Sequence, residues 1–336
     1  MTRDTTRPTW LAWTVMAVAC AGVVVVAWAC ATAWGAVLHG HPAYAVLLGL
    51  TTIGCALALR RSLHPPETRA RWRRVLDVAG VVAGIGWLAA TAWLRPFTAV
   101  EPALAAMASD ADVTVTETAT HVDLVPAGEP SGTAVLFQPG AKVEARAYAA
   151  VLRPLAEAGH TVVIVKQPLG VGFLAAGATA DAREAHPEAD RWVLGGHSLG
   201  GVVAAAETND DRGVVAAAET DDDVDPGGSR AGEPGPPVVG LLLYASYPAG
   251  DLSASLTAEV ASISGSRDGL STTADIDASR ANLPVDSTFT VVEGAVHADF
   301  ADYGPQPGDG TPTLPRDDAR NQISEASVRF VDGLGD

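Results

Sequence analysis

The sequence RWVLGGHSLGG occupies residues 191–201 and contains the pattern Gly-x-Ser-x-Gly, with Gly196, Ser198 and Gly200 at the fixed positions. An apolar, strand-like run precedes the pattern, and the helix-compatible run GVVAAAE follows it. A serine on a sharp turn between a strand and a helix needs small residues two places before and after it, since larger side chains would collide. The pattern alone is weak evidence in a glycine-rich chain. Its setting makes Gly196, His197 and Gly200 a candidate nucleophile elbow around Ser198.

Short apolar segments alternate with helix-like segments on both sides of this elbow. We expect strands at residues 113–116, 121–125, 133–137, 161–165, 191–194, 238–244, 260–264 and 289–292, and helices at 144–158 and 316–331. The first two strands alternate polar and apolar residues, as antiparallel strands often do. Most of the later ones are apolar throughout, which is typical of parallel strands covered on both faces. The pattern predicts an α/β fold with helices on both faces of a mostly parallel sheet.

A serine nucleophile needs a general base, and the base needs a carboxylate that orients it. In such a fold the acid and then the histidine follow the serine along the chain. His297 is the only histidine after Ser198, and Asp268 follows the end of a predicted strand. Asp275 and Asp277 compete for the role of the acid, but they fall in a predicted helix. We therefore expect Ser198, Asp268 and His297 to form a catalytic triad.

Two backbone N–H groups are expected to form an oxyanion hole. The first belongs to Leu199, directly after the serine. The second should come from the loop after the strand at 133–137, where Ala141 is the first candidate and Gly140 the alternative. Lys142 would either add positive potential at the mouth of the site or remain solvated. This chemistry requires no metal and no organic cofactor.

The first 95 residues are predicted to form a membrane anchor. Three apolar segments, at residues 10–37, 43–59 and 76–94, are long enough to cross a bilayer as helices. A cleaved signal peptide is the alternative for the first segment, because arginines precede it and Ala-Thr-Ala at 31–33 resembles a cleavage site. The segment is longer than a typical signal core, however, and two further apolar segments follow it.

The arginines of this region predict the orientation of the anchor. Six of them lie between residues 60 and 74, on the loop after the second segment, whereas the loop at 39–42 has no fixed charge. The positive-inside rule places the arginine-rich loop and the N-terminus in the cytoplasm. With three spans, everything after Arg95 would then lie on the extracytoplasmic side of the cell membrane.

Charge divides the chain at the same place. Residues 1–95 hold nine basic and three acidic side chains. The remainder of the chain holds 13 of the 22 basic residues and 36 of the 39 acidic residues. A region with such an acidic excess would repel phosphates, so nucleic-acid binding is disfavoured. All three cysteines lie in the apolar segments, which excludes a cysteine-based metal site or disulfide framework after residue 95.

A tandem repeat follows the elbow. GVVAAAET occurs at residues 201–208 and again at 213–220, before an acidic tract at 221–225 and a Gly/Pro-rich stretch. We interpret the first copy as the helix after the serine, and the second copy with the acidic tract as a solvated insertion at 209–237. A calcium site in the tract is the alternative, but its aspartates lack EF-hand spacing. The expected division is a connector at 96–112 and a hydrolase domain at 113–336.

Five blocks of sequence resemble the α/β-hydrolase fold-5 family in the family's order. They are FQPGAKVEARAYAAVLRPLAEAGHTVVIVKQPL, RWVLGGHSLGG, LLLYASYPAGDL, SISGSRDGL and VVEGAVHADFADYGPQPGDG, within about residues 130–333. The resemblance implies a serine hydrolase with Ser198, Asp268 and His297 as its triad. Two features depart from the family: Ala141 stands where a second glycine is usual, and the repeat follows the nucleophile helix.

The expected function is a membrane-anchored serine hydrolase of the esterase or lipase type, acting on a small acyl ester. The bilayer is its other expected partner, through the N-terminal helices. An acyltransferase with the same triad is one alternative, and a non-catalytic interaction module is another, because a fold does not fix a function. Residues 168–180 are a candidate cover over the site, but they specify no acyl group.

Overall fold

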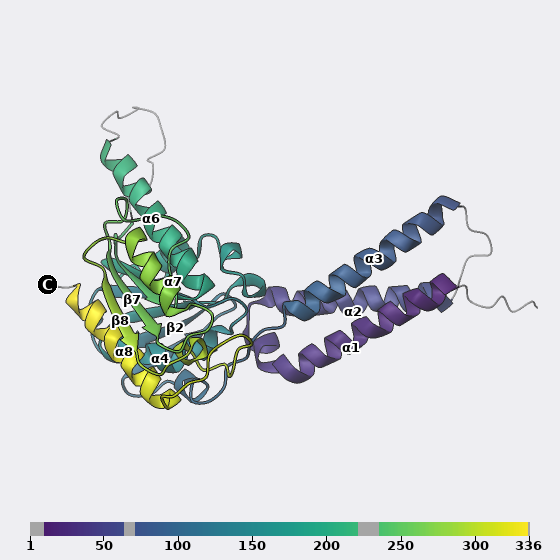
Figure 1. The fold of residues 1–336 in the computed structure, drawn as a ribbon, viewed down its shortest axis with the longest axis horizontal. Helices are drawn as coiled ribbons and strands as arrows, with labels where there is room; N and C mark the ends of the chain where they lie inside the picture. The colour runs from purple at the N-terminus through teal and green to yellow at the C-terminus, as the bar shows by residue number, and fades with distance from the viewer. Residues whose placement is uncertain (1–9, 64–70, 221–234, 335–336) are drawn as a thin grey trace, which may run out of the picture. The chain divides into compact units, whose positions relative to one another are not determined.

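The computed structural model describes residues 10–63, 71–220 and 235–334. The chain forms two compact units, Met1–Pro96 and Phe97–Asp336. Figure 1 shows long helices in the first unit and a sheet flanked by helices in the second.

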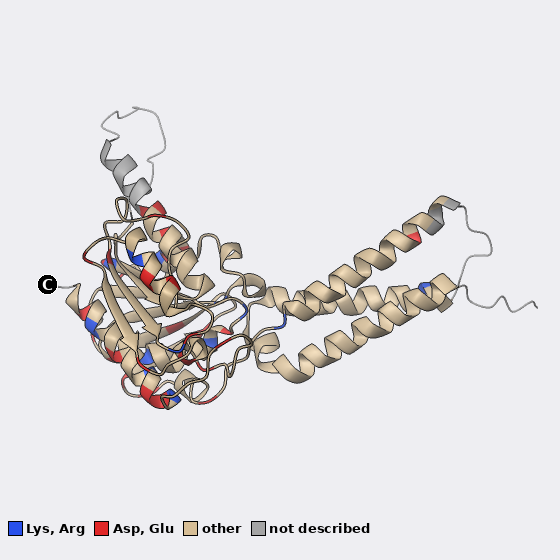
Figure 2. Ribbon diagram, viewed as in Figure 1, with Lys and Arg blue, Asp and Glu red and all other residues tan. Residues whose placement is uncertain are grey.

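The N-terminal unit consists of helices α1 (Trp10–His39), α2 (Pro42–Leu63) and α3 (Arg71–Trp93). All three are long and apolar enough to span a membrane, α3 from Val75 onward. Few charged residues lie along them, whereas acidic and basic residues are spread over the second unit (Figure 2). Many large apolar side chains on these helices are exposed, including Trp13, Val24 and Ile53. Such surfaces suit a hydrocarbon environment and suggest that the protein is membrane-associated.

The second unit is built on an eight-stranded sheet in the order β1-β2-β4-β3-β5-β6-β7-β8. The strands are β1 (Val113–Glu117), β2 (His121–Pro126), β3 (Thr133–Gln138), β4 (Thr161–Val165), β5 (Arg191–His197), β6 (Val238–Tyr244), β7 (Glu259–Gly265) and β8 (Thr288–Val292). Only the pairs β1–β2 and β2–β4 are antiparallel. The eight predicted strands and the mostly parallel sheet are therefore confirmed.

Helices cover both faces of this sheet. The α-helices are α4 (Ala149–Glu157), α5 (Ala178–Ala185), α6 (Leu199–Thr220), α7 (Thr273–Ser279) and α8 (Arg316–Gly333). Short 3-10 helices lie at Ala105–Met107, Ala145–Tyr148, Pro168–Gly170, Gly172–Leu174, Arg280–Asn282 and His297–Phe300.

Alternate residues of the central strands face two separate apolar clusters. Phe137 packs in the cluster that includes residues of α4 and α8, while its neighbour Leu136 packs in the cluster that includes residues of α5 and α6. Since side chains alternate across a strand, a run such as TAVLF must be apolar at every position to fill both clusters. This explains why the buried strands are visible in the sequence.

Helix α6 differs from the expectation for the repeat. Its backbone continues to Thr220 and therefore includes the second copy of GVVAAAET, so the predicted loop is wrong for that copy. The physical reason is that both copies have the same composition, in which three alanines and a glutamate favour a helix. The first copy already provides the helix onto which the second can add, and propagation is easier than nucleation. The acidic tract at 221–225 lies outside the described residues.

Candidate active site

The turn between β5 and α6 holds Ser198 in a left-handed backbone conformation. Its φ angle is +53°, which a non-glycine residue rarely adopts. The Ser198 N–H donates to the carbonyl of Tyr244 at 3.0 Å, and Ser246 Oγ donates to the carbonyl of Ser198 at 2.6 Å. Such a conformation costs on the order of 1–3 kcal/mol and persists only where the surroundings impose it. Hydrogen bonds on both sides of the Ser198 backbone impose it here.

The elbow has no room for side chains at its two glycines. A Cβ atom on Gly196 would lie 2.3 Å from the carbonyl carbon of Gly200. A Cβ atom on Gly200 would lie 2.0 Å from the carbonyl oxygen of Gln138 at the end of β3. Helix α6 thus starts in direct backbone contact with β3, which brings the turn next to the loop that follows that strand.

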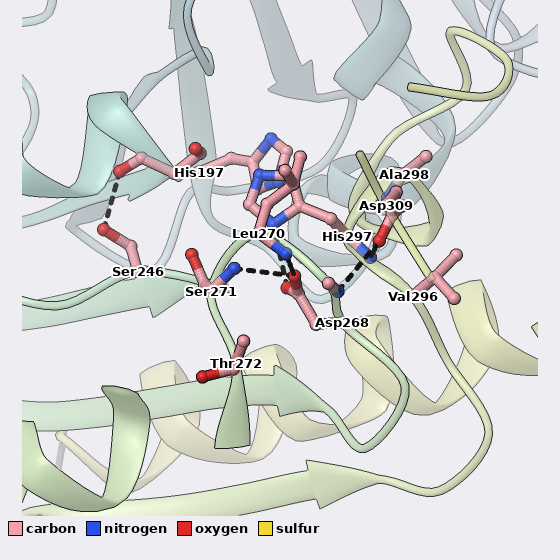
Figure 3. A network of polar contacts seen from close by, with 12 residues as sticks. His197, Ser246, Asp268, Leu270, Ser271, Thr272, Val296, His297, Ala298 and Asp309 are labelled. Atoms are coloured by element: carbon pink, nitrogen blue, oxygen red, sulfur yellow. Dashed lines mark hydrogen bonds and ion pairs between the residues drawn. The ribbon is translucent and has the colours of Figure 1, made fainter. Parts of the chain in front are cut away.

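Asp268 and His297 meet at the ends of β7 and β8. His297 Nδ1 lies 2.8 Å from Asp268 Oδ2, and both side chains are buried. The other carboxylate oxygen, Oδ1, accepts the N–H groups of Leu270 and Ser271, each at 2.7 Å (Figure 3). This carboxylate can hold the proton of a neutral imidazole on Nδ1 and leave Nε2 as an acceptor.

Asp309 fixes the loop that carries His297, although no motif in the sequence marks this residue. Its carboxylate accepts the N–H of His297 at 3.1 Å and that of Ala298 at 2.9 Å (Figure 3). It also accepts the N–H of Gly269 at 3.2 Å, beside Asp268. One carboxylate therefore ties together the two loops that carry the predicted acid and base. An aspartate in the glycine-rich stretch GPQPGDG was the only available signal.

The structure brings His297 and Asp268 together but does not join Ser198 to them by a hydrogen bond. His297 Nε2 is buried and has no hydrogen-bond partner among the described residues. The ring of His197, the residue directly before the serine, packs against the ring of His297, with 4.5 Å between their centroids. The contact between Ser198 Oγ and His297 Nε2 therefore stays a prediction. Catalytic hydrogen bonds are often long without substrate and shorten when it binds.

The loop after β3 supplies one free N–H group. The Gly140 N–H donates to Tyr148 Oη at 2.8 Å, and the Lys142 N–H donates to the carbonyl of Gly170 at 2.7 Å. Among the described residues, no hydrogen bond engages the N–H of Ala141 or of Leu199, the first residue of α6. The N–H of Gly140, the alternative second donor, already has an acceptor in this conformation. Ala141 and Leu199 remain available.

The same loop is held from three sides. Phe97 donates its N–H to the carbonyl of Lys142 at 2.7 Å, and the ammonium group of Lys142 lies 5.5 Å from the centre of the Phe97 ring. The buried Gln167 side chain donates to the carbonyl of Pro139 at 2.9 Å. Gly170, within the candidate cover at 168–180, provides the third contact through its bond to Lys142. A backbone hydrogen bond thus connects the cover to the loop.

The described part of the chain contains no cluster of side chains that could bind a metal ion. No group of three or more His, Cys, Asp or Glu side chains there is arranged to hold a metal ion. The three cysteines, in α1 and α2, are free thiols.

The sheet order, the strand–Ser198–helix turn and the buried histidine–aspartate pair define the α/β-hydrolase fold. The sequence matches the alpha/beta hydrolase family over residues 134–223 and 229–321, more than half of the chain. The chain belongs to this family, and the resemblance seen in the five sequence blocks is confirmed.

Several solved structures have similar folds. An esterase from Pseudomonas putida is 14% identical with a TM-score of 0.45, covering 69% of this chain and 87% of its own. The esterase Est2 of Thermogutta terrifontis is 14% identical with a TM-score of 0.42 over 67% and 92% of the two chains. An alpha-beta serine hydrolase homologue from Coxiella burnetii is 13% identical with a TM-score of 0.41 over 66% and 98%. No curated protein matches the chain.

Proposed function

We propose that this protein is a membrane-anchored serine hydrolase that cleaves carboxylic esters. The observation that carries the proposal is the buried pair of His297 and Asp268, 2.8 Å apart, together with a serine on a left-handed turn whose preceding residue, His197, packs against His297. A histidine oriented by a carboxylate can activate the hydroxyl group of a serine on a strand-to-helix turn for attack on an acyl carbonyl.

The proposed reaction begins when Ser198 Oγ attacks the acyl carbon and passes its proton to His297 Nε2. Asp268 stabilises the imidazolium that forms. The N–H groups of Leu199 and Ala141 bind the oxyanion of the tetrahedral intermediate, each contributing on the order of 3 kcal/mol. His297 then returns the proton to the leaving alcohol, which leaves an acyl group on Ser198. Water, activated by the same histidine, releases the acid and restores the serine.

Ester hydrolysis is tested with the purified full-length chain in detergent micelles. We expect it to release p-nitrophenol from a series of p-nitrophenyl esters, acetate to palmitate, and to yield the free acid as the main product even with added glycerol. An acylglycerol as the main product would instead assign an acyltransferase. Absence of turnover together with absence of labelling by a fluorophosphonate would contradict both activities and favour a non-catalytic module.

The same proposal places the hydrolase unit on the extracytoplasmic side, with the arginine-rich loop between α2 and α3 in the cytoplasm. It rests on the three membrane-compatible helices and the positive-inside rule. We expect protease added to intact cells to remove the hydrolase unit, as detected with a C-terminal epitope tag. A cytoplasmic marker protein must stay intact in the same sample. Full protection of the tag until the membrane is permeabilised would contradict this orientation.

A further inference from the structure

We propose that Tyr148 and His197 are positioning residues that connect the oxyanion loop to the catalytic histidine. Neither touches the acyl group in the proposed reaction. Each acts instead through a residue that does, Tyr148 through the loop carrying Ala141 and His197 through His297. This inference rests on the proposed serine hydrolase function.

A chain of two hydrogen bonds carries the inference. The Gly140 N–H donates to Tyr148 Oη at 2.8 Å, and Tyr148 Oη lies 2.8 Å from His197 Nδ1. Both side chains are almost completely buried, at 0% and 1% exposure. In such an environment the loss of a hydrogen-bond partner is costly, and a chain of hydrogen bonds is strengthened by cooperativity.

The donors in this chain fix the proton positions. The Gly140 N–H can only donate, so it occupies a lone pair of Tyr148 Oη and leaves the hydroxyl proton free to donate to His197 Nδ1. Burial raises the pKa of the Tyr148 hydroxyl, which keeps that proton in place. The arrangement in which both the Gly140 N–H and the Tyr148 hydroxyl find acceptors leaves His197 Nδ1 unprotonated. The ring proton of neutral His197 then lies on Nε2, which is buried and has no hydrogen-bond partner among the described residues.

A neutral His197 suits its place beside the proposed base. Burial lowers the pKa of His197 well below its usual value, and the adjacent His297 lowers it further. The two ring centroids are 4.5 Å apart, and the His197 ring also stacks on Phe300 at 5.9 Å. A second positive charge at this position would oppose the imidazolium that forms on His297 during catalysis. The Tyr148 hydroxyl holds His197 in the form that avoids this.

The packing leaves the loop little freedom while the chain of hydrogen bonds is intact. A Cβ atom on Gly140 would lie 2.9 Å from His197 Nδ1 and 3.3 Å from Tyr148 Oη. Without the hydroxyl, the buried Gly140 N–H would have no acceptor and its peptide would rotate toward another one. The next N–H along the chain belongs to Ala141, so this rotation would displace the proposed oxyanion donor.

Tyr244 offers a matched control for Tyr148. It is also fully buried and also packs against Phe137, with ring centroids 5.0 Å apart compared with 5.2 Å for Tyr148. Its hydroxyl, however, bonds to Ser327 Oγ at 2.6 Å in helix α8. Tyr148→Phe and Tyr244→Phe each remove one buried hydrogen bond, but only the first bond leads to the oxyanion loop. The Tyr244 carbonyl that accepts the Ser198 N–H belongs to the backbone, so Tyr244→Phe keeps it.

Both variants are compared with wild type as full-length protein in detergent, using kcat, KM and the thermal midpoint. We expect Tyr148→Phe to lower kcat by about 10-fold or more, because loss of an oxyanion donor costs about 100- to 1,000-fold and displacement costs part of that. Its KM should change by less than about 2-fold, since the lost interaction acts in the transition state. Tyr244→Phe should keep kcat within about 2-fold of wild type. Its thermal midpoint should shift about as much as that of Tyr148→Phe, because each variant loses one buried hydrogen bond. An unchanged kcat in Tyr148→Phe, or an equal loss in both variants, would overturn the proposal.

A second pair of variants tests the role of His197. This pair also tests the proposal if Tyr148→Phe fails to fold. The Asn Oδ1 of His197→Asn can accept the Tyr148 hydroxyl in place of Nδ1, whereas His197→Leu removes the acceptor. We expect the asparagine variant to retain at least about 5-fold more kcat than the leucine variant, because only it keeps the hydrogen bond to Tyr148. Equal losses would assign His197 a packing role only.

If hydrolysis survives Ser198→Ala, the proposed function itself fails. If it requires Ser198 but tolerates Tyr148→Phe, only this inference fails.

Discussion

Ser198→Ala is expected to lower kcat for ester hydrolysis by about 10⁵-fold, because loss of the nucleophile removes the acyl-enzyme route and leaves only binding and oxyanion stabilisation. The fold should survive, since the hydrogen bonds that hold residue 198 use its backbone N–H and carbonyl groups. The measurement is the rate of p-nitrophenol release by the full-length variant, with circular dichroism to check the fold.

Ser324→Ala is the matched control for this change. Ser324 is a buried serine of helix α8 whose hydroxyl donates to the carbonyl of Val151 at 2.8 Å, and it belongs to no part of the proposed site. Its replacement should leave kcat within about 2-fold of wild type while lowering stability by about 1 kcal/mol. Comparable activity in Ser198→Ala and Ser324→Ala would exclude Ser198 as the nucleophile.

Asp268→Asn is expected to lower kcat by about 10⁴-fold through a change of tautomer at His297. The N–H groups of Leu270 and Ser271 both donate to Oδ1 of the aspartate, so the carbonyl oxygen of an asparagine must take that position. Its NH₂ group would then face His297 Nδ1 and donate to it, which moves the ring proton to Nε2. An imidazole protonated on Nε2 cannot accept the proton of Ser198.

The control for this substitution is Asp275→Asn. Asp275 accepts the Thr272 N–H at the start of α7, and its capping hydrogen bonds are all with Thr272 rather than with His297 or Ser198. We expect its kcat to stay within about 2-fold of wild type, since an exposed cap contributes to helix stability and not to the reaction. If Asp268→Asn retained full activity in the same assay, the orienting role of Asp268 would be wrong.

The fold and the main candidates were predictable because they depend on local patterns. Apolar runs such as TVVIV at 161–165 fill clusters on both faces of the sheet, so composition alone marks them as strands. The strand–Ser198–helix turn was equally local. The order of Asp268 and His297 along the chain follows from the topology of the sheet, which requires both residues at strand ends.

The parts that the sequence missed depend on contacts that form only in the folded chain. Tyr148 reaches His197 across 49 residues, and Asp309 reaches the His297 backbone across 12. Neither residue belongs to a motif, because a hydroxyl or carboxylate that binds backbone groups can come from any nearby element. The same holds for Gly140, since only the position of Tyr148 shows that the Gly140 N–H has an acceptor.

The central claim is that Ser198 is the nucleophile of a serine hydrolase, and covalent labelling tests it most directly. The full-length chain is treated with a fluorophosphonate, digested, and its modified peptide is identified by mass spectrometry. We predict a single phosphonyl adduct on Ser198, formed at the rate at which ester hydrolysis is lost and absent from Ser198→Ala. An adduct on another residue, or full loss of hydrolysis without modification of Ser198, would contradict the assignment.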